Sequence, residues 1–508
     1  MKITIIGAGL GGLTFAAEAI RDGHEVVIYD KNSKPGGVVA LLEHEGYKFE
    51  QGPLLIGDML PGEPIYDFLD ELGIHLDTVR ADRDIVMPDY AMITPKEYKG
   101  PYWRRERLKE LFPEESDGID AYYRFYDDVM KLRYIAGEKP TILNKIRLAL
   151  AFLKIKKYSN MNADELTKHF FKSEKIRTLY TGILADFCAD PAESQGLAVV
   201  FTNFETAFDK RIPLDKNGKK YYPGYCYIKG GCQKLPEALA EYVTANGGKI
   251  IYNTVVEKVL VDDGKVKGVR LSSGEEISSD VVVGCGAGKD FFEETVGRKH
   301  LDDEYREILD TFRPMEAVFM LHLGVDYDPM EHLRAPLVYC YGMYDLHEAT
   351  VKLRTGVYHE GNDGYLLFVP SAHAPEFAPE GKHCVTIYTV APDTLKVGDW
   401  ESDKERYAEM LIKLAERQLP GLAERQLPGL SKHIDTMKIM TARDYSEYTH
   451  MKKSSFGGVV PIKGQKNPPH KTPVKHLWFV GQQSENAGGL GNVILGAKSA
   501  YEKAFPKN

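Results

Sequence analysis

Short apolar runs and small residues alternate along the first thirty positions. Ile3–Ile6 has the composition of a short buried strand, Leu13–Ile20 has helical composition and spacing, and Glu25–Asp30 is a second apolar run that ends in an acid. A glycine-rich segment, residues 7–12, joins the first run to the helix. This order predicts a strand, a tight turn, a helix and a second strand, which is the start of a parallel α/β sheet.

The glycine segment has the G-x-G-x-x-G spacing of a dinucleotide-binding turn. Gly7 allows the tight turn, Gly9 lets the backbone approach a pyrophosphate, and Gly12 lets the helix pack closely on the strand. The helix N-terminus offers backbone N–H groups and a partial positive charge to phosphates. Asp30 is placed to bind both ribose hydroxyls, which favours an adenine dinucleotide without a 2′-phosphate. The motif does not separate NAD from FAD.

Further segments carry a family resemblance. Residues 31–37 and 46–53 resemble the FAD-binding start of the amine oxidase superfamily, and residues 476–481 with 488–500 resemble its closing strand and glycine-rich loop. Residues 227–235 resemble the Gly-Gly-then-helix element of the superfamily. Residues 365–371 and 378–383 resemble its phytoene desaturase-like branch, which includes carotenoid desaturases and retinol saturase. The resemblance implies FAD as the cofactor. The residues expected to bind it are Gly7, Gly9, Gly11, Gly12, Asp30, Lys31, Gly36, Gly37, Val38, Gly52, Pro53, Val256, Gly481, Gln482, Gly491, Asn492 and Val493.

Three departures from the family pattern concern the flavin environment. Val38 stands where the family usually has an arginine that reaches the pyrophosphate, and Gln482 replaces an acid after the closing strand. The prolines usual in the closing glycine-rich loop are absent.

The fold class that we expect is α/β, with a discontinuous Rossmann-type FAD-binding domain and a mixed α+β substrate lobe. The FAD-binding domain is predicted to comprise residues 1–80, 222–295 and 435–508. Residues 81–221 have helical character and form a predicted substrate- or membrane-facing insertion, and residues 296–434 form a β-rich substrate lobe. Within this lobe, alternating strands are expected over residues 317–323 and 384–390. Leu414–Gly421 is repeated at Leu422–Gly429, which we interpret as a tandem duplication in a surface connection.

Composition narrows the class of protein. The 508 residues carry a net charge of −9, which disfavours a nucleic-acid partner. Six cysteines without C-x-x-C spacing and fifteen histidines without ligand spacing predict neither a disulfide scaffold nor a metal site. The chain has no apolar run long enough to span a membrane and no signal-peptide pattern at its start. We therefore expect a cytoplasmic protein.

One basic segment qualifies that expectation. Residues 142–158 contain five Lys or Arg residues, no acid and a broad apolar side. A basic amphipathic helix of this kind is typical of a segment that binds the inner face of a membrane peripherally. A core helix whose lysines reach out to solvent is the alternative.

The function that we expect is hydride transfer between flavin and a C–C bond of a hydrophobic, polyene- or isoprenoid-like substrate, as a desaturase, saturase or isomerase. Glu485 and Tyr227 are the candidate catalytic residues, with Tyr225 in place of Tyr227 as an option. A loop acid that caps backbone N–H groups, and tyrosines that pack a lobe interface, are the structural alternatives. An amine oxidase-like flavoenzyme and a non-catalytic prenyl-lipid escort protein are the competing functions. The sequence does not identify the electron partner.

Overall fold

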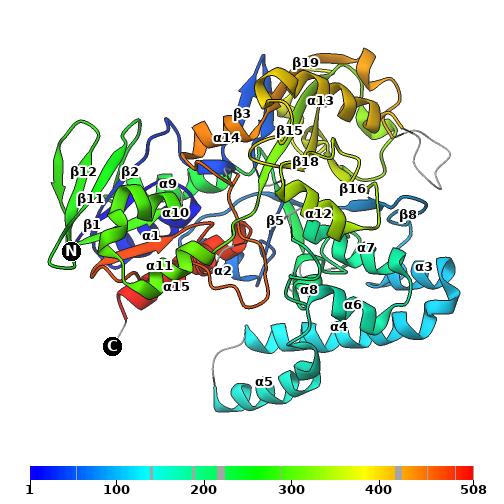
Figure 1. The fold of residues 1–508 in the computed structure, drawn as a ribbon, viewed down its shortest axis with the longest axis horizontal. Helices are drawn as coiled ribbons and strands as arrows, with labels where there is room; N and C mark the ends of the chain where they lie inside the picture. The colour runs from blue at the N-terminus through cyan, green and yellow to red at the C-terminus, as the bar shows by residue number, and fades with distance from the viewer. Residues whose placement is uncertain are drawn as a thin grey trace.

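The computed structural model describes residues 1–52, 54–137, 141–185, 189–213, 224–286, 288–417, 426–454, 456–486 and 488–506. Both termini lie at one side of the molecule, where segments from the beginning, middle and end of the chain form one layered part (Figure 1). A β-rich part and a group of helices make up the other side (Figure 1). The second copy of the duplicated octapeptide begins outside the described residues.

A five-stranded parallel sheet forms the centre of the layered part. Its order is β10-β2-β1-β14-β20, with β1 (Lys2–Ile6), β2 (Glu25–Tyr29), β10 (Lys249–Ile251), β14 (Val281–Cys285) and β20 (Leu477–Val480). Ile5 pairs with Ile28 on one side and with Val283 on the other. The predicted strand–turn–helix–strand unit is therefore confirmed, and so is the α/β fold class.

Three helices cover this sheet. The helix α1 (Leu10–Arg21) is buried along almost its whole length and packs against α9 (Lys234–Ala245) and α15 (Leu490–Ala504). A buried apolar cluster joins these helices to the sheet through side chains such as Leu13, Phe15, Leu239 and Ala497. An antiparallel sheet of β11 (Val256–Asp262), β12 (Lys265–Leu271) and β13 (Glu276–Ser278) leads back into β14.

The β-rich part is a seven-stranded mixed sheet. Its order is β19-β15-β18-β17-β16-β7-β8, with β7 (Arg83–Val86), β8 (Ala91–Met92), β15 (Ala317–Val325), β16 (Leu337–Tyr341), β17 (Gly364–Phe368), β18 (His383–Ala391) and β19 (Ile434–Met440). Helix α13 (Trp400–Ala415) packs against this sheet through Trp400, Tyr407 and Leu411. The strands expected around residues 317–323 and 384–390 are confirmed as β15 and β18.

Two strands differ from the predicted division of the chain. β7 lies in the segment expected to be helical. It is a strand of the seven-stranded sheet, because it pairs in parallel with β16, with Arg83 opposite Leu337. β19 begins at the predicted boundary and pairs with β15, so it belongs to the seven-stranded sheet and not to the parallel one. The three-part division itself stays a prediction.

The helical part consists of α3 (Trp103–Leu111), α4 (Ser116–Ala136), α5 (Ile142–Ile155), α6 (Ala163–Phe170), α7 (Glu174–Ala185) and α8 (Ala198–Thr202). Buried aromatic side chains of α4, α6 and α7, Tyr122, Phe170 and Tyr180 among them, form one cluster with the seven-stranded sheet. The α4–α5 pair projects from the lower edge of the molecule in Figure 1.

Smaller elements connect the parts. They are β3 (Leu41–His44), β4 (Tyr47–Glu50), β5 (Ile56–Gly57), β6 (Thr78–Arg80), β9 (Tyr225–Ile228), α2 (Pro64–Glu71), α10 (Gly288–Asp290), α11 (Asp303–Thr311), α12 (Leu346–Arg354) and α14 (Ala442–Thr449). Among the described helices, none combines the length and apolar character that crossing a bilayer requires.

Candidate active site

The glycine turn after β1 shapes the first wall of the site. Gly7 has φ +104°, and a Cβ there would lie 2.8 Å from the carbonyl oxygen of Cys285, so this position requires glycine. At Gly12 a Cβ would lie 2.2 Å from the Gly7 carbonyl oxygen, which explains how α1 packs so closely on the turn. Gly12 supports the turn from behind and does not line the cavity described below.

Gly9 faces open space. It is the N-cap of α1 with φ −73°, and the nearest atom to a Cβ there would be the Cys285 sulfur at 3.5 Å. Gly9, Leu10 and Gly11 all line the cavity, so the positive end of the α1 dipole opens into it. A backbone cradle at a helix N-terminus, left open where a side chain would stand, fits a pyrophosphate.

Asp30 follows β2 directly and lies on the same wall. Its two carboxylate oxygens accept the N–H of Ala8 at 2.6 Å and of Asn32 at 2.7 Å, so backbone fixes the orientation of the carboxylate. Burial raises the pKa of Asp30, while these two N–H groups oppose that rise. A fixed carboxylate at the end of the second strand fits the two hydroxyls of a ribose.

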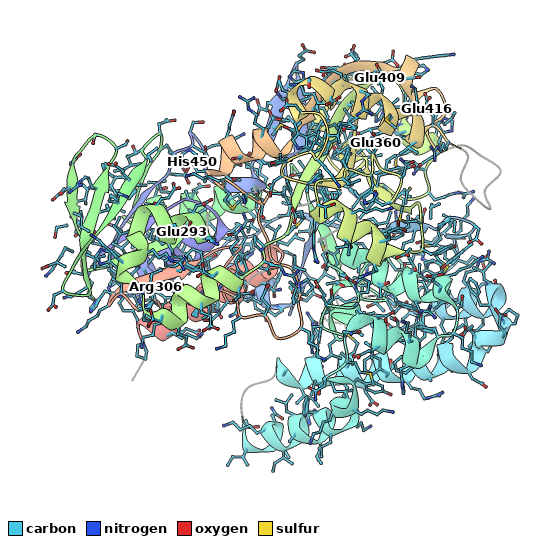
Figure 2. All side chains as sticks on the ribbon, viewed as in Figure 1. Glu293, Arg306, Glu360, Glu409, Glu416 and His450 are labelled. Carbon is cyan, nitrogen blue, oxygen red and sulfur yellow. The ribbon has the colours of Figure 1, made fainter. Side chains whose placement is uncertain are left out.

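Positive and aromatic groups surround the same end of the site. Burial lowers the pKa of Lys31 to about 8. His450 follows α14 in the left-handed region with φ 60° (Figure 2). It lines the wall together with Tyr448 and the predicted residue Val256. The segment 448–451 was not expected from the sequence, because it has no glycine or charge pattern of its own.

The closing segment forms the opposite wall. Gly481 follows β20 and lies against Gly11, where a Cβ would be 2.9 Å from the Gly481 nitrogen. Gln482 donates from its amide nitrogen to the carbonyl oxygen of Phe456 at 3.5 Å, so a neutral group occupies the position where the family has an acid. Gly491, Asn492 and Val493 begin α15 and line the same wall.

A single cavity of about 1380 Å³ joins these walls. The predicted cofactor residues that line it are Gly7, Gly9, Gly11, Asp30, Lys31, Gly36, Gly37, Val38, Gly52, Val256, Gly481, Gln482, Gly491, Asn492 and Val493. Pro53 lies outside the described residues. The sequence therefore located one side of the cavity, although a binding role for each residue stays a prediction.

The other half of the cavity is apolar. It lies between the seven-stranded sheet, the helical part and β9, and its lining includes Leu54, Leu55, Ile183, Leu197, Ala198, Phe201, Phe204, Phe208, Tyr225, Leu337, Tyr339, Leu366, Tyr388 and Val460. The ring of Tyr225 stacks on that of Phe208 with centroids 4.7 Å apart. An apolar chamber of this size fits a long hydrophobic molecule.

One ion pair lies on the apolar side. Asp58 and Arg133 meet at 2.6 Å, and both line the cavity. Asp58 is also close to the start of α15, since its Oδ2 would lie 3.5 Å from a Cβ on Gly491. Arg133 belongs to α4, so the pair joins the helical part to the cofactor side.

The two candidate catalytic residues lie away from the cavity. Glu485 accepts the N–H of His470 at 2.9 Å and pairs with Lys503 on α15. Burial opposes ionisation there, but these contacts lower the pKa of Glu485 overall. This geometry fits the alternative in which Glu485 is a loop acid that caps a backbone N–H, because one oxygen binds the His470 N–H and the other binds Lys503.

Tyr227 is fully buried and donates its hydroxyl to Glu50 at 2.9 Å. Burial raises its pKa, which leaves the phenol protonated. Of the two tyrosines considered, only Tyr225 reaches the cavity wall. A catalytic role for Tyr227 stays a prediction, and its ring packs against His373 and Phe377, away from the cavity lining.

A cysteine that the sequence did not point to lies at the centre of the site. The Cys285 sulfur, at the end of β14, accepts the N–H of Gly12 at 3.2 Å and lines the cavity. Burial raises the pKa of this thiol to about 12, so it stays protonated. Its place at the carboxyl end of a parallel strand beside β1 is the signal that could have identified it.

The structure describes no cluster of three His, Cys, Asp or Glu side chains placed to hold a metal ion in the ranges given above. The described cysteines are free thiols, and Cys188 lies outside those ranges.

Comparisons with known proteins agree with this site. The profile of the family described as flavin containing amine oxidoreductase matches residues 10–482. A 4,4'-diapophytoene desaturase (4,4'-diaponeurosporene-forming) of Staphylococcus aureus is 25% identical over 99% of this chain and 98% of its own length. An oxidoreductase of Methanosarcina mazei has a similar structure, with a TM-score of 0.64, 19% identity and coverage of 99% of this chain and 100% of its own. The PF1083 protein of Pyrococcus furiosus gives a TM-score of 0.61 at 18% identity, covering 99% and 97%.

Proposed function

This chain belongs to the flavin-containing amine oxidoreductase family and is an FAD-dependent oxidoreductase, and on that premise we propose that it transfers hydride between FAD and a C–C bond of a long polyene or isoprenoid-like substrate. The observation that carries this proposal is the continuity of the cavity. Its glycine-rich half fits the dinucleotide, and its other half presents aliphatic and aromatic side chains in the same space.

The polyene class is favoured over amines by the charges on the apolar side. An amine substrate is a cation at neutral pH, and its burial calls for a negatively charged partner. In the apolar half, Asp58 is an acid that lines the wall, but its carboxylate already forms an ion pair with Arg133. It is therefore not free to bind an amine cation. The Staphylococcus relative, named as a desaturase of 4,4'-diapophytoene, supports the same choice.

A non-catalytic lipid escort protein is disfavoured by the cofactor half. The open cradle at Gly9 and the carboxylate of Asp30, held by two backbone N–H groups, fit the pyrophosphate and the ribose of a dinucleotide. A protein that only carried a lipid would not need this arrangement.

FAD supplies hydride transfer when it is bound. The chain supplies orientation and a dry environment. The first turn of α1 and the carboxylate of Asp30 would hold the dinucleotide, while Phe208, Tyr225 and Tyr339 line the half of the cavity in which a conjugated chain would lie. The protonated thiol of Cys285 presents no negative charge to the phosphates.

The test starts with a visible spectrum of the purified protein, followed by release of the flavin with heat. We expect flavin bands and released FAD. Anaerobic addition of 4,4'-diapophytoene is then expected to bleach the flavin and to give a product that absorbs at longer wavelength.

Other results would identify the direction of the reaction. Reduced protein that bleaches a polyene identifies a saturase, and a changed polyene without net flavin reduction identifies an isomerase. A colourless protein that does not take up FAD contradicts the proposal, and so does flavin reduction by amines alone.

We further propose that α5 binds the surface of an anionic membrane, from which an apolar substrate reaches the cavity. Apolar side chains of α5 are strongly exposed: Ile142 81%, Leu143 65%, Ile146 53%, Leu150 60% and Leu153 61%. Exposure of this extent argues against the alternative of a core helix. Lys145, Arg147, Lys154, Lys156 and Lys157 on the same segment complement anionic headgroups. α5 packs on α4, whose Arg133 lines the cavity.

A further inference from the structure

Two buried arginines lie behind the aromatic wall of the cavity. Arg83 on β7 is 5% exposed and Arg104 on α3 is 4% exposed. Both line a small pocket of about 10 Å³, together with Glu205, Phe204 and Phe208. Phe204 and Phe208 also line the large cavity, so the two spaces share a wall of two rings.

The arginines share one neutral acceptor. The side-chain oxygen of Asn203 accepts from Arg83 at 2.6 Å and from Arg104 at 3.4 Å. Glu205 lies 3.6 Å from Arg104 and also accepts the hydroxyl of Tyr123 at 2.7 Å. The pocket therefore contains two cations and one carboxylate, with a net charge of one positive unit.

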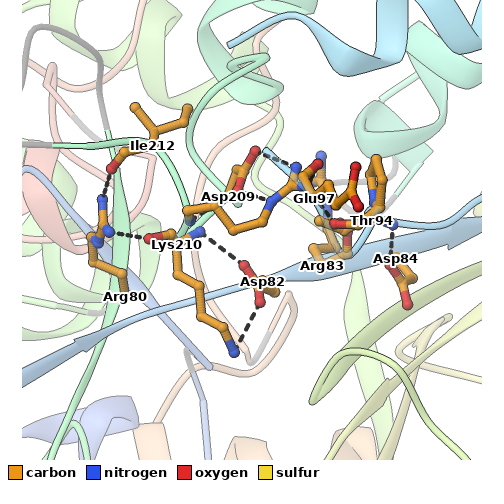
Figure 3. A network of polar contacts seen from close by, with 11 residues as sticks. Arg80, Asp82, Arg83, Asp84, Thr94, Glu97, Asp209, Lys210 and Ile212 are labelled. Atoms are coloured by element: carbon orange, nitrogen blue, oxygen red, sulfur yellow. Dashed lines mark hydrogen bonds and ion pairs between the residues drawn. The ribbon is translucent and has the colours of Figure 1, made fainter. Parts of the chain in front are cut away.

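The two acids next to Arg83 in the sequence bind other groups. Asp82 and Asp84 flank Arg83 on the strand, and successive side chains of a strand point to opposite faces. Asp82 binds Lys210 through its ammonium at 3.1 Å, and Asp84 accepts the N–H of Thr94 at 2.9 Å (Figure 3). Asp209 holds Arg211 with two hydrogen bonds of 2.8 Å (Figure 3). Among the described residues, no carboxylate forms an ion pair with Arg83.

Aromatic faces offset this charge in part. The guanidinium carbon of Arg83 lies 3.9 Å from the ring centroid of Phe208 and 4.9 Å from that of Tyr339. Burial lowers the pKa of Arg83 and Arg104 acts in the same direction, yet a guanidinium stays protonated in proteins. Arg104 also has two buried nitrogens, Nε and Nη2, without a hydrogen-bond acceptor among the described residues, and Glu205 Oε1 has no donor there. A buried pocket whose charged side chains carry one net positive charge calls for a negative ligand.

We propose that the pocket between Arg83 and Arg104 binds a small monovalent anion at the wall of the substrate cavity. A volume of about 10 Å³ admits one atom of the size of water. The ligand is therefore a halide ion or a single carboxylate oxygen at the end of a substrate or product chain. The carboxylate source rests on the proposed function, whereas the halide source does not.

The first experiment measures the chlorine-35 NMR line width of the flavin-loaded protein during titration with sodium chloride. The variants are Arg83→Met, which keeps the length of the side chain and removes its charge, and Arg107→Met, which removes an exposed arginine from α3. A halide site predicts saturable broadening in the parent and in Arg107→Met. It predicts affinity at least about tenfold weaker in Arg83→Met, the scale of one lost charge-assisted hydrogen bond.

The second arm compares a long polyene carboxylic acid with the hydrocarbon of the same length. Affinity is read from quenching of flavin fluorescence without turnover, so the result does not depend on the reaction. A carboxylate site predicts that Arg83→Met weakens binding of the acid about tenfold or more and leaves the hydrocarbon unchanged. The acid then displaces any bound chloride.

Each combination of results decides the proposal. Chloride broadening that Arg83→Met abolishes and the acid does not displace assigns the site to a halide. Selective loss of acid binding assigns it to the substrate end. The proposal is overturned by equal acid affinity in the parent and Arg83→Met together with chloride broadening that is either absent in the parent or unchanged in Arg83→Met. That outcome leaves the flavin spectrum, and with it the proposed function, untouched.

Discussion

At the scale of single residues, the openness of Gly9 leads to a direct prediction. Gly9→Val is expected to abolish flavin binding, because the backbone at φ −73° accepts valine and the new methyl groups would occupy the space of the pyrophosphate. The visible spectrum and the FAD content of the purified variant measure this effect.

The matched control for that variant is Gly137→Val. Gly137 ends α4 with φ −81° and does not line the cavity. Its spectrum should equal that of the parent. Retention of flavin by Gly9→Val would mean that the dinucleotide lies elsewhere.

The buried carboxyl of Glu50 makes stability depend on pH. Burial raises its pKa from 4.5 to about 7, although the Cys232 N–H and the Tyr227 hydroxyl oppose the rise. A folded-state pKa above the unfolded value gives stability that is complete below pH 4.5 and is lost as the pH rises through 7. Glu50→Gln, whose amide oxygen can accept the same two hydrogen bonds, removes that loss.

We therefore expect the stability of Glu50→Gln relative to the parent to increase by about 2.5 kcal/mol between pH 5 and pH 8. Urea unfolding at the two pH values measures this difference. Glu110→Gln, at an exposed position of α3, is the control and should show little change. A difference for Glu50→Gln that does not vary with pH would contradict the assignment of this carboxyl.

Residue roles could be predicted where they depend on local backbone. The turn at Gly7 and the position of Asp30 follow from a strand, a helix and a strand in order. Glu485 and Tyr227 could not be assigned, because the direction of a side chain depends on distant partners such as Lys503 and Glu50.

At the scale of elements, α5 carries a prediction about membranes. Lys154, Lys156 and Lys157 changed together to Glu should release the protein from vesicles that contain anionic lipid, since local attraction becomes repulsion. Sedimentation with the vesicles measures the bound fraction. In the control variant, Lys249, Lys265 and Lys475 are changed to Glu. These lysines are exposed in the part that contains the parallel sheet, and the change in total charge is the same.

The apolar side of α5 gives an independent check of the same surface. Ile146→Ser with Leu150→Ser should weaken vesicle binding without loss of fold, because both side chains are already more than half exposed. A parent protein that never sediments with vesicles would exclude this role for α5.

Elements could be predicted where their apolar pattern is regular. The strand around residues 317–323 was expected because its residues are almost all apolar. β7 was missed because Asp82, Arg83 and Asp84 resemble a solvated charged segment, although all three are buried. Its place in the sheet depends on β16, about 250 residues further along the chain.

At the scale of the whole molecule, the shared cavity predicts that its two halves can be disabled separately. Ala198→Trp adds a large ring to the apolar half, where Ala198 of α8 lines the wall. We expect polyene binding to fall about tenfold or more while the flavin spectrum stays intact, because a filled chamber excludes a long ligand. Flavin fluorescence quenching by 4,4'-diapophytoene measures polyene binding in this variant. Loss of flavin from Ala198→Trp would show that the halves are not independent.

The cofactor class could be predicted at this scale because two glycine-rich turns at opposite ends of the chain meet in one site. The chamber could not be predicted in the same way. Its lining side chains come from the seven-stranded sheet, from helices and from loops whose apolar residues have no distinguishing pattern before they are brought together.

The order of strands in the parallel sheet has a consequence for synthesis of the protein. β1 pairs with β2 from the same segment, but its other neighbour, β14, lies about 280 residues later, and β20 at the edge comes near the end of the chain. Such distant pairings give a high contact order and slow assembly. The first glycine turn therefore emerges from the ribosome long before Gly481 and α15 can close the site. FAD is expected to be captured only after Gly481 and α15 have been synthesised, and until then the unpaired edge of β1 is exposed to aggregation.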